Sequence, residues 1–173
     1  MHKHAYRAVI FDLDGVLTDT AHYHFLAWKQ LADSVGVSFD AAFNEQLKGV
    51  DRIGSLNLIL AASGKNFSEL EKLALAEQKN QHYQQLIADM SPLDLLPGAL
   101  TALHTVRAAG LKTALASVSK NAQAVIAKLG IANLFDVVVD AARISKSKPD
   151  PEIFLTAAAH LKLMPSDCLG VED

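Results

Sequence analysis

The order of apolar and polar residues divides the chain into three stretches of different character. The first is the apolar run 8–11, which has the length of a buried strand in a parallel sheet. The second, from about residue 20 to residue 88, has apolar side chains at the three- and four-residue spacings of helices. In the third, after Pro97-Gly98, helical and strand-like segments alternate. This order predicts a sheet protein that carries a helical insertion after its first strand.

Four helices are predicted within the insertion. One covers residues 21–35 and ends at Gly36, and two shorter ones cover residues 41–47 and 54–62. Ser68 and Glu71 have the spacing of a capping box, which predicts a fourth helix through Leu86. The apolar face of the first helix is made of Phe25, Trp28, Leu31, Ala32 and Val35. The fourth helix is expected to pack through Leu73, Ala76, Asn80, Tyr83 and Ile87.

The alternating stretch predicts helices over residues 99–109, 121–129 and 151–161, and strands over 111–116, 135–139 and 168–171. Strands that alternate with helices are joined by right-handed crossovers, so the sheet is parallel and helices cover both of its faces. We therefore predict the α/β class. A Rossmann-like core is expected from residues 1–19 and 91–173, with an inserted α-helical cap domain from residues 20–90.

Composition narrows the class of protein but not the chemistry. Half of the 173 residues are hydrophobic and a fifth are charged, with a formal net charge of −3. That charge creates no field that would attract nucleic acid. No run approaches the roughly 20 apolar residues of a membrane span, and the first residues lead directly into the first strand, so we expect a cytoplasmic protein. The single cysteine, Cys168, is expected to be a buried structural thiol.

Two aspartates, Asp12 and Asp14, directly follow the first apolar run and are themselves followed by Gly15. If strand geometry persists through Leu13, both carboxylates leave the same face of the sheet. Neighbouring carboxylates repel each other unless a cation or a shared proton relieves them. The pair therefore suits a divalent-metal site in which one member could be a nucleophile. The alternative is a simple turn, because Asp and Gly both favour turns.

The carboxyl ends of the other strands add further polar groups. Ligands of open parallel sheets bind beyond these ends. Besides the two aspartates, this edge holds Ser117, Lys148, Glu172 and Asp173. Such a set suits phosphoryl transfer with a magnesium ion. Each member also has a simpler explanation: Ser117 could cap the following helix, Lys148 could be a solvated loop lysine, and the two acids could form a surface turn.

The segment Phe11–Thr20 resembles the first motif of the haloacid dehalogenase superfamily, whose members transfer phosphoryl groups through an aspartate nucleophile. The segment that begins at Ser117, the pair Lys148-Pro149 and the segment Gly170–Asp173 resemble the second, third and fourth motifs in order and spacing. The resemblance covers the whole chain. Within the cap, segments 21–28 and 43–50 are similar to those of the sugar phosphomutases of the superfamily.

This resemblance implies a HAD-like core in which Asp12 is the nucleophile and Asp14 the general acid and base. Ser117 and Lys148 would hold the transferring phosphoryl oxygens. The implied ligands of one Mg²⁺ ion are the Asp12 carboxylate, the Asp14 main-chain carbonyl, Glu172 and Asp173. The implied contacts to substrate are Thr20, His24, Trp28, Lys48, Gly49, Arg52, Ser55, Lys79, Asn80, Val118, Ser119, Lys120 and Asn121.

Among the implied cap contacts, Arg52 would bind the distal phosphate of a sugar bisphosphate, since its planar fork matches phosphate geometry. Without the family pattern, Lys48 and Arg52 are better explained as solvated charges at helix ends. His22 and His24, two residues apart, suggest packing or a hinge more than a metal site, because neighbouring helical positions diverge.

The reaction implied by the resemblance interconverts β-D-glucose 1-phosphate and β-D-glucose 6-phosphate through β-D-glucose 1,6-bisphosphate. The expected partner is a small sugar phosphate, without nucleic acid or membrane, and the expected state is a monomer. Two alternatives stay open: a sugar-phosphate phosphatase with the same core residues, and a non-catalytic fragment. Since relatives continue beyond the fourth motif, we expect the chain to be a truncated form of a longer protein.

Overall fold

The computed structural model describes residues 6–47 and 50–173, which form two compact units. The first unit combines the described part of Met1–Asp19 with Met90–Asp173, and the second is the described part of Thr20–Asp89. The chain thus enters the second unit at Thr20 and leaves it after Asp89. In the part of the chain that the structure covers, no helix has the length and apolar character needed to cross a membrane.

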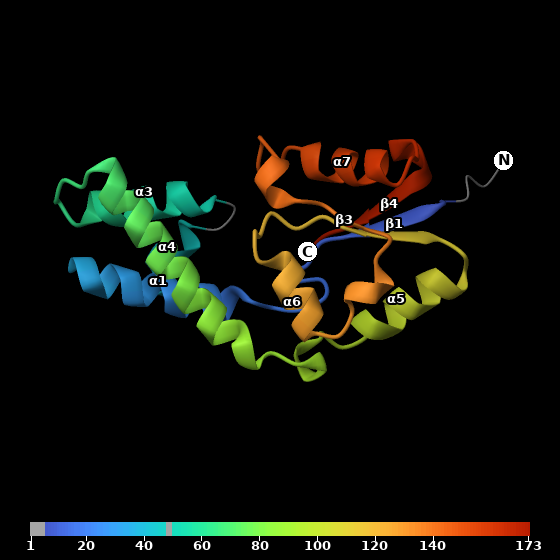
Figure 1. The fold of residues 1–173 in the computed structure, drawn as a ribbon, viewed down its shortest axis with the longest axis horizontal. Helices are drawn as coiled ribbons and strands as arrows, with labels where there is room; N and C mark the ends of the chain where they lie inside the picture. The colour runs from blue at the N-terminus through green and yellow to red at the C-terminus, as the bar shows by residue number, and fades with distance from the viewer. Residues whose placement is uncertain (1–5, 48–49) are drawn as a thin grey trace. The chain divides into compact units, whose positions relative to one another are not determined.

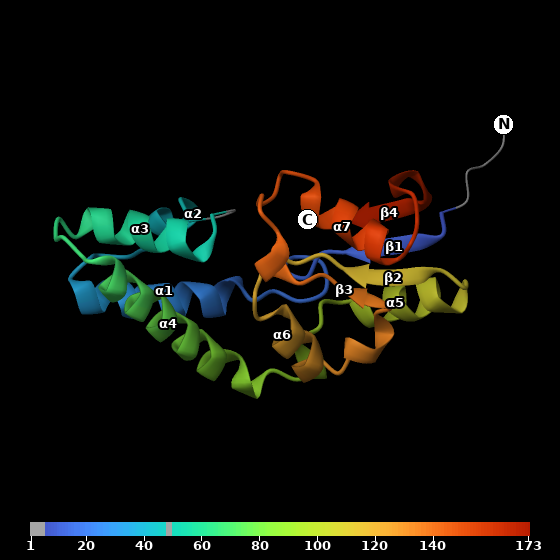
Figure 2. The same ribbon diagram turned by 45° about the horizontal axis from the view of Figure 1, so that its top comes forward.

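The first unit is built on a four-stranded sheet in which all the neighbouring strands are parallel (Figure 2). The strands are β1 (Ala8–Phe11), β2 (Lys112–Leu115), β3 (Val137–Val138) and β4 (Cys168–Val171), in the order β3-β2-β1-β4. Phe11 at the end of β1 lies opposite Leu115 of β2 and Val171 of β4. The carboxyl ends of these three strands therefore coincide, and the predicted parallel α/β sheet is confirmed.

Helices cover both faces of this sheet (Figure 1). Helix α7 (Glu152–His160) lies on one face, whereas α5 (Ala99–Ala108) and α6 (Ala122–Lys128) lie on the other. Short 3-10 helices connect the elements: η2 (Pro92–Asp94), η3 (Ala132–Leu134), η4 (Ala141–Arg143) and η5 (Pro165–Asp167). The α7 face buries Ile153, Ala157 and Ala158 against strand residues that include Ala8, Ile10 and Ala114. This packing fixes the start of α7 relative to the strands.

Strand β3 is shorter than the 135–139 run predicted from the sequence, because Asp136 interrupts the regular ladder. The main-chain N–H of Thr113 donates to the carboxylate of Asp136 at 2.7 Å, where a regular ladder would use a carbonyl. Val137 and Val138 are in register with β2, and the N–H groups of Asp136 and Val139 still donate to the Thr113 and Leu115 carbonyls. Cys168 also differs from expectation: it is half-buried and not buried, because β4 pairs only with β1 among the described strands.

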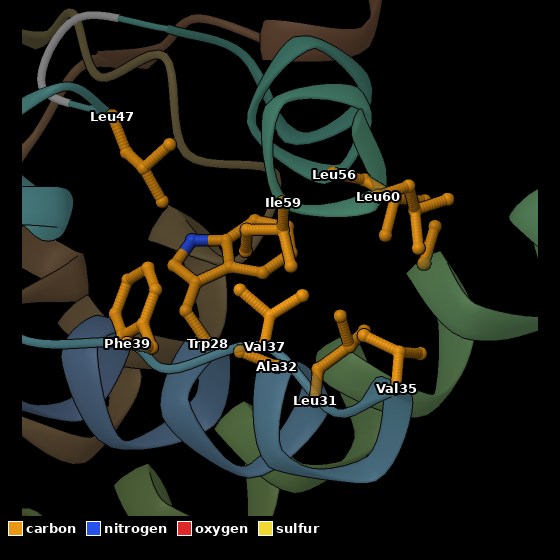
Figure 3. Packing of buried hydrophobic residues seen from close by; sticks show 11 residues of the cluster. Trp28, Leu31, Ala32, Val35, Val37, Phe39, Leu47, Leu56, Ile59 and Leu60 are labelled. Atoms are coloured by element: carbon orange, nitrogen blue, oxygen red, sulfur yellow. The ribbon is translucent and has the colours of Figure 1, made fainter. Parts of the chain in front are cut away.

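The second unit contains α1 (Ala21–Val35), α2 (Ala41–Glu45), α3 (Arg52–Ala62), α4 (Glu69–Leu86) and η1 (Ile87–Asp89). Its apolar core is drawn in Figure 3, where Trp28 lies among side chains from α1, α3 and the connecting segments. The predicted face of the first helix is confirmed by the burial of Trp28 and Leu31, and α3 buries Leu56 and Ile59. Gly36 ends α1 with φ of 84°, a conformation that favours glycine.

Helix α4 begins with the predicted capping box, in which Ser68 Oγ accepts the Glu71 N–H at 3.3 Å and the Glu71 carboxylate accepts the Ser68 N–H at 2.7 Å. The predicted packing face was wrong at Leu73, which is 60% exposed. Leu75 packs on the core in its place, and the face continues through Ala76 and Lys79. A hydrophobicity pattern cannot identify a lysine as part of a buried face.

Candidate active site

The turn after β1 carries both predicted aspartates. The strand ends at Phe11, and main-chain N–H groups of Leu17 and Thr18 donate to the Leu13 carbonyl. The alternation of a strand therefore does not extend to Asp14, so the condition under which both carboxylates would leave one face is not met. Asp12 is nevertheless fixed at the sheet edge, because its N–H donates to the Val171 carbonyl at 2.9 Å.

The Asp12 carboxylate lies at the centre of an ionic cluster. Lys148 Nζ is 2.8 Å from Asp12 Oδ2 and 2.9 Å from Glu172 Oε1. The other Asp12 oxygen accepts the Leu13 N–H at 2.7 Å. Burial raises the pKa of Asp12, while the hydrogen bond and charge of Lys148 oppose that rise. Lys148 is only 16% exposed, so it is not the solvated loop lysine that the sequence allowed.

Gly15 brings the last residue of the chain against this turn. A Cβ atom on Gly15 would lie 2.5 Å from Asp173 Oδ2, and Gly15 has φ of 77°. A side chain at this position would displace the Asp173 carboxylate and strain the backbone. Asp173 therefore packs on the turn that carries Asp14, which a simple surface turn at Glu172-Asp173 would not require.

The donor chemistry of this edge fits a hard divalent cation. Asp12, Asp14, Glu172 and Asp173 supply only oxygen donors, as Mg²⁺ prefers, and Lys148 offsets one of their four negative charges. Within residues 6–47 and 50–173, no group of three or more His, Cys, Asp or Glu side chains is already arranged around a metal position. The ammonium group of Lys148 lies between two of the predicted ligands instead.

Two residues at the start of α7 contact the Lys148 segment, and sequence reasoning missed both. The Glu152 carboxylate accepts N–H groups from Ser145 and Lys146 at 2.9 and 2.7 Å, and the Ser145 hydroxyl at 2.8 Å. These hydrogen bonds lower the pKa of Glu152. The Phe154 ring lies 5.1 Å from Lys148 Nζ, measured to the ring centroid. In the sequence, the only indication of a role for Glu152 and Phe154 is that they closely follow the third motif, Lys148-Pro149.

The segment after β2 contains the second predicted motif. Ala116 N–H donates to the Phe11 carbonyl at 2.8 Å, so Ser117 follows directly beside the end of β1. Ser117 is buried, and its hydroxyl accepts the Ser119 N–H at 3.2 Å. The residue before α6 is Asn121, which makes no side-chain capping bond. The alternative in which Ser117 caps this helix is therefore wrong. Val118 and Lys120 are exposed on the same segment.

In the second unit, Lys79 is buried among aromatic rings and beside a histidine. Its Nζ lies 2.9 Å from His24 Nδ1 and over the rings of Trp28 and Tyr83, 4.5 and 5.0 Å from their centroids. The His24 and Tyr83 rings are stacked with centroids 4.1 Å apart. Burial and the charge of Arg52 lower the pKa of Lys79 to about 7. Burial, Lys79 and Arg52 lower the pKa of His24 to about 3.

Arg52 begins α3 and belongs to the same cationic region. Its guanidinium donates to the Asn80 side-chain oxygen at 2.9 Å, and burial lowers its pKa while the charge of Glu77 opposes this. Ser55 is 2% exposed and its hydroxyl donates to the Val50 carbonyl at 3.4 Å. The cationic region is thus more than a set of solvated helix-end charges.

Three predicted contacts remain to be placed. Thr20 is fully buried, and its carbonyl accepts the His24 N–H at 3.0 Å. Lys48 and Gly49 lie outside the described residues. The structure therefore brings predicted residues together in each unit. Asp12, Lys148 and Glu172 are in contact in the first unit, where Asp173 lies against Gly15. The second unit groups His24, Trp28, Lys79 and Arg52 with Asn80.

Comparisons with known proteins cover nearly all of the chain. The model of the haloacid dehalogenase-like hydrolase family matches residues 6–173. A β-phosphoglucomutase of Bacillus subtilis (strain 168) is 47% identical over 169 residues, which cover 96% of this chain and 75% of the relative. A phosphorylated carbohydrates phosphatase of Thermotoga maritima is 32% identical over 169 residues, which cover 96% of this chain and 76% of the relative.

The same likeness holds for the structure. The crystal structure of β-phosphoglucomutase from Clostridium difficile superposes with a TM-score of 0.91 at 47% sequence identity, covering 97% of this chain and 76% of that chain. The chain thus spans about three quarters of the length of these relatives.

Proposed function

Because this chain belongs to the haloacid dehalogenase-like hydrolases, we propose that it catalyses the β-phosphoglucomutase reaction. In this reaction β-D-glucose 1-phosphate and β-D-glucose 6-phosphate interconvert through β-D-glucose 1,6-bisphosphate. The observation that carries the proposal is the likeness of both units, core and cap together, to proteins with this activity. The alternative of a non-catalytic protein is disfavoured, since binding alone does not need a carboxylate held as Asp12 is held.

In the proposed chemistry, an Asp12 carboxylate oxygen attacks the 1-phosphate phosphorus of β-D-glucose 1,6-bisphosphate. The bond from this phosphorus to the sugar O1 breaks, Asp14 gives O1 a proton, and β-D-glucose 6-phosphate leaves. In the second step the 6-hydroxyl of β-D-glucose 1-phosphate loses its proton to Asp14 and attacks the aspartyl phosphate, which frees the Asp12 carboxylate and regenerates the bisphosphate. Lys148, 2.8 Å from Asp12, supports the ionised state that attack requires.

A magnesium ion would be held by the Asp12 carboxylate, the Asp14 main-chain carbonyl, Glu172 and Asp173. When bound, it would offset the negative charge gathered by phosphate and carboxylates. Lys148 and the hydroxyl of Ser117 would bind the transferring phosphoryl oxygens, where charge spreads during transfer. The main-chain N–H groups of Val118 and Lys120 offer additional donors, since those of Ser119 and Asn121 already donate to the Ser117 and Ser119 hydroxyls.

The cationic region of the second unit would bind the rest of the substrate. A bisphosphate carries a second dianion, which needs a donor set of its own. Arg52, oriented by Asn80, presents a planar fork suited to phosphate. Lys79 and His24 present polar atoms suited to sugar hydroxyls, and Thr20 fixes the start of the helix that carries His24. Trp28 supports Lys79 from within the apolar core and is 5% exposed.

The test is to incubate the chain with β-D-glucose 1-phosphate, Mg²⁺ and a trace of β-D-glucose 1,6-bisphosphate, and to follow phosphorus by NMR. The expected result is glucose 6-phosphate with little inorganic phosphate, and no product when Mg²⁺ is chelated. The α-anomer serves as a matched control and should not react. Phosphate release without glucose 6-phosphate would overturn the proposal.

The second candidate is a sugar-phosphate phosphatase, which the similarity to the Thermotoga phosphatase favours. It would use the same core residues and differ only in the acceptor, since water would attack the aspartyl phosphate. The same NMR experiment separates the two candidates by the ratio of glucose 6-phosphate to inorganic phosphate.

A further inference from the structure

The position of Lys148 between two acids is not explained by those acids alone. Its Nζ is within 2.9 Å of both Asp12 and Glu172, so both carboxylates attract the same ammonium group. An ammonium has three donors on a flexible four-carbon stem, so it could approach either acid in many orientations. A third contact is needed to fix its place.

That third contact is the face of the Phe154 ring. Lys148 Nζ lies over this ring at 5.1 Å from its centroid, within the range of a cation–π interaction. With the Lys148 side chain only 16% exposed, water competes weakly for the ammonium. A cation–π contact has more effect where the cation is desolvated.

The ring itself is held by its surroundings. Phe154 lies on α7 and packs against the apolar core between this helix and the sheet. In addition, two ring carbons lie 3.4 and 3.5 Å from the place where a Cβ atom of Gly170 would be. Gly170 is two residues before Glu172 in the same strand-to-end segment. The ring thus contacts both the lysine and the segment that delivers one of its acids.

We propose that Phe154 is a positioning residue whose ring face holds the Lys148 ammonium between Asp12 and Glu172. This role for Phe154 rests on the proposed function, in which Lys148 binds the transferring phosphoryl oxygens. A misplaced ammonium weakens charge stabilisation in the transition state more than substrate binding. The loss should therefore fall on kcat and leave KM nearly unchanged.

The first test compares substitutions in the full chain. Phe154→Leu removes the ring but keeps apolar volume, and Phe154→Tyr keeps the ring. Phe135→Leu is the matched control, since Phe135 is also half-buried in the first unit but contacts the Phe11 ring instead. We expect kcat to fall roughly 3- to 30-fold for F154L, with KM within about twofold, and F154Y to retain activity. A loss in F154L no larger than in F135L would contradict the proposal.

The second test separates the ring's charge distribution from its shape. Phenylalanine with one, two or three fluorines at position 154 keeps its size while the ring face becomes less negative. We expect the logarithm of kcat to fall linearly with the number of fluorines. A constant kcat across the series would show that Phe154 only fills space, and this series stays decisive even if F154L does not fold.

The third test makes no use of the sugar. In protein with labelled lysine, NMR should show a ring-current shift of the Lys148 side-chain methylene next to Nζ, lost in F154L and kept in F154Y. Absence of this shift would overturn the proposal directly. If the wild type lacks mutase activity but the shift is present, the fluorine series is measured on hydrolysis of p-nitrophenyl phosphate. In that case the proposed function is wrong, and the fluorine series still shows whether Phe154 positions Lys148.

Discussion

At the scale of single residues, each polar cluster depends on a charged side chain placed where burial changes its behaviour. Asp12 is held at the sheet edge by its own N–H and by Lys148. Lys79 is surrounded by rings and has no acid among the partners described above. Burial of a charged group lowers the free energy of unfolding, because water would solvate that group better. Buried charged groups of this kind are typical of functional sites.

Replacing Asp12 with Asn tests the nucleophile. The amide cannot form an acyl phosphate, so we expect turnover to fall by at least roughly 10³-fold while the fold persists. Acid-quenched protein should carry a phosphoryl group on the peptide that contains residue 12 in the wild type and none in the variant. A label on a histidine or serine would contradict the assignment.

Lys79 should make the stability of the chain depend on pH. Its pKa is lowered from 10.5 to about 7, so between these values the unfolded state binds a proton that the folded state does not. The free energy of unfolding should then rise with pH over this window, with a contribution of up to about 1.4 kcal/mol per pH unit, and level off above it.

The measurement is urea unfolding from pH 7 to pH 10 for the wild type and Lys79→Met. The variant should lack the rise. Lys72→Met on the same helix is the matched control, since Lys72 forms a surface ion pair with Glu69 at 2.8 Å. If the free energy of unfolding rose equally with pH in the wild type and K79M, Lys79 would not have the lowered pKa.

At the scale of elements, helix ends place the functional segments. The first turn of α7 carries Glu152, which accepts hydrogen bonds from Ser145 and Lys146, and Phe154, which contacts Lys148. Helix α4 depends on its capping box for its start. In each case a side chain satisfies main-chain groups that a helix or loop leaves unpaired.

Glu152→Gln should release the segment that carries Lys148. The amide keeps the shape but loses the charge that strengthens three hydrogen bonds, so kcat should fall several-fold with little change in thermal midpoint.

The same contact should depend on pH. Because these bonds lower the Glu152 pKa, the Ser145 and Lys146 amides should stay bonded to Glu152 as pH falls to about 4.5 and be released only below it. Hydrogen exchange of the Ser145 and Lys146 amides measures this, and slow exchange in E152Q would contradict it.

Ser68→Ala should weaken the start of α4. It removes the acceptor of the Glu71 N–H, and losses of this kind cost about 1 kcal/mol. Chemical unfolding should show this loss, and Ser68→Thr should restore most of it. An unchanged free energy of unfolding in S68A would mean that tertiary packing alone fixes this helix.

At the scale of the whole molecule, the sequence predicted the α/β class, the parallel sheet and most helix bounds, because apolar periodicity follows burial closely. The predicted strand bounds were wrong where polar groups take over hydrogen bonds that a regular strand would make. Asp136 shortens β3, and the turn after Phe11 ends β1 before Asp14. The order of the motifs predicted Asp12 and Lys148, but it could not predict Phe154 or Glu152, since their contacts depend on how α7 packs.

Each unit has its own apolar core, which allows a test of their energetic independence. Ile59→Ala in the second unit should cost roughly 2–5 kcal/mol, since Ile59 is fully buried. Hydrogen exchange should accelerate across Thr20–Asp89 and remain slow at the strand amides of the first unit. Uniform acceleration in both units would show that they unfold as one.

The strand order has a consequence for synthesis on the ribosome. β1 is made first, but it lies between β2 and β4, whose residues emerge about a hundred and about a hundred and sixty positions later. The nascent chain can therefore complete the contiguous Thr20–Asp89 unit while β1 still waits for both neighbours. Lys148 can join Asp12 to Glu172 only after translation has passed β4, so a chain stalled before that point carries a complete Thr20–Asp89 unit and no acid cluster.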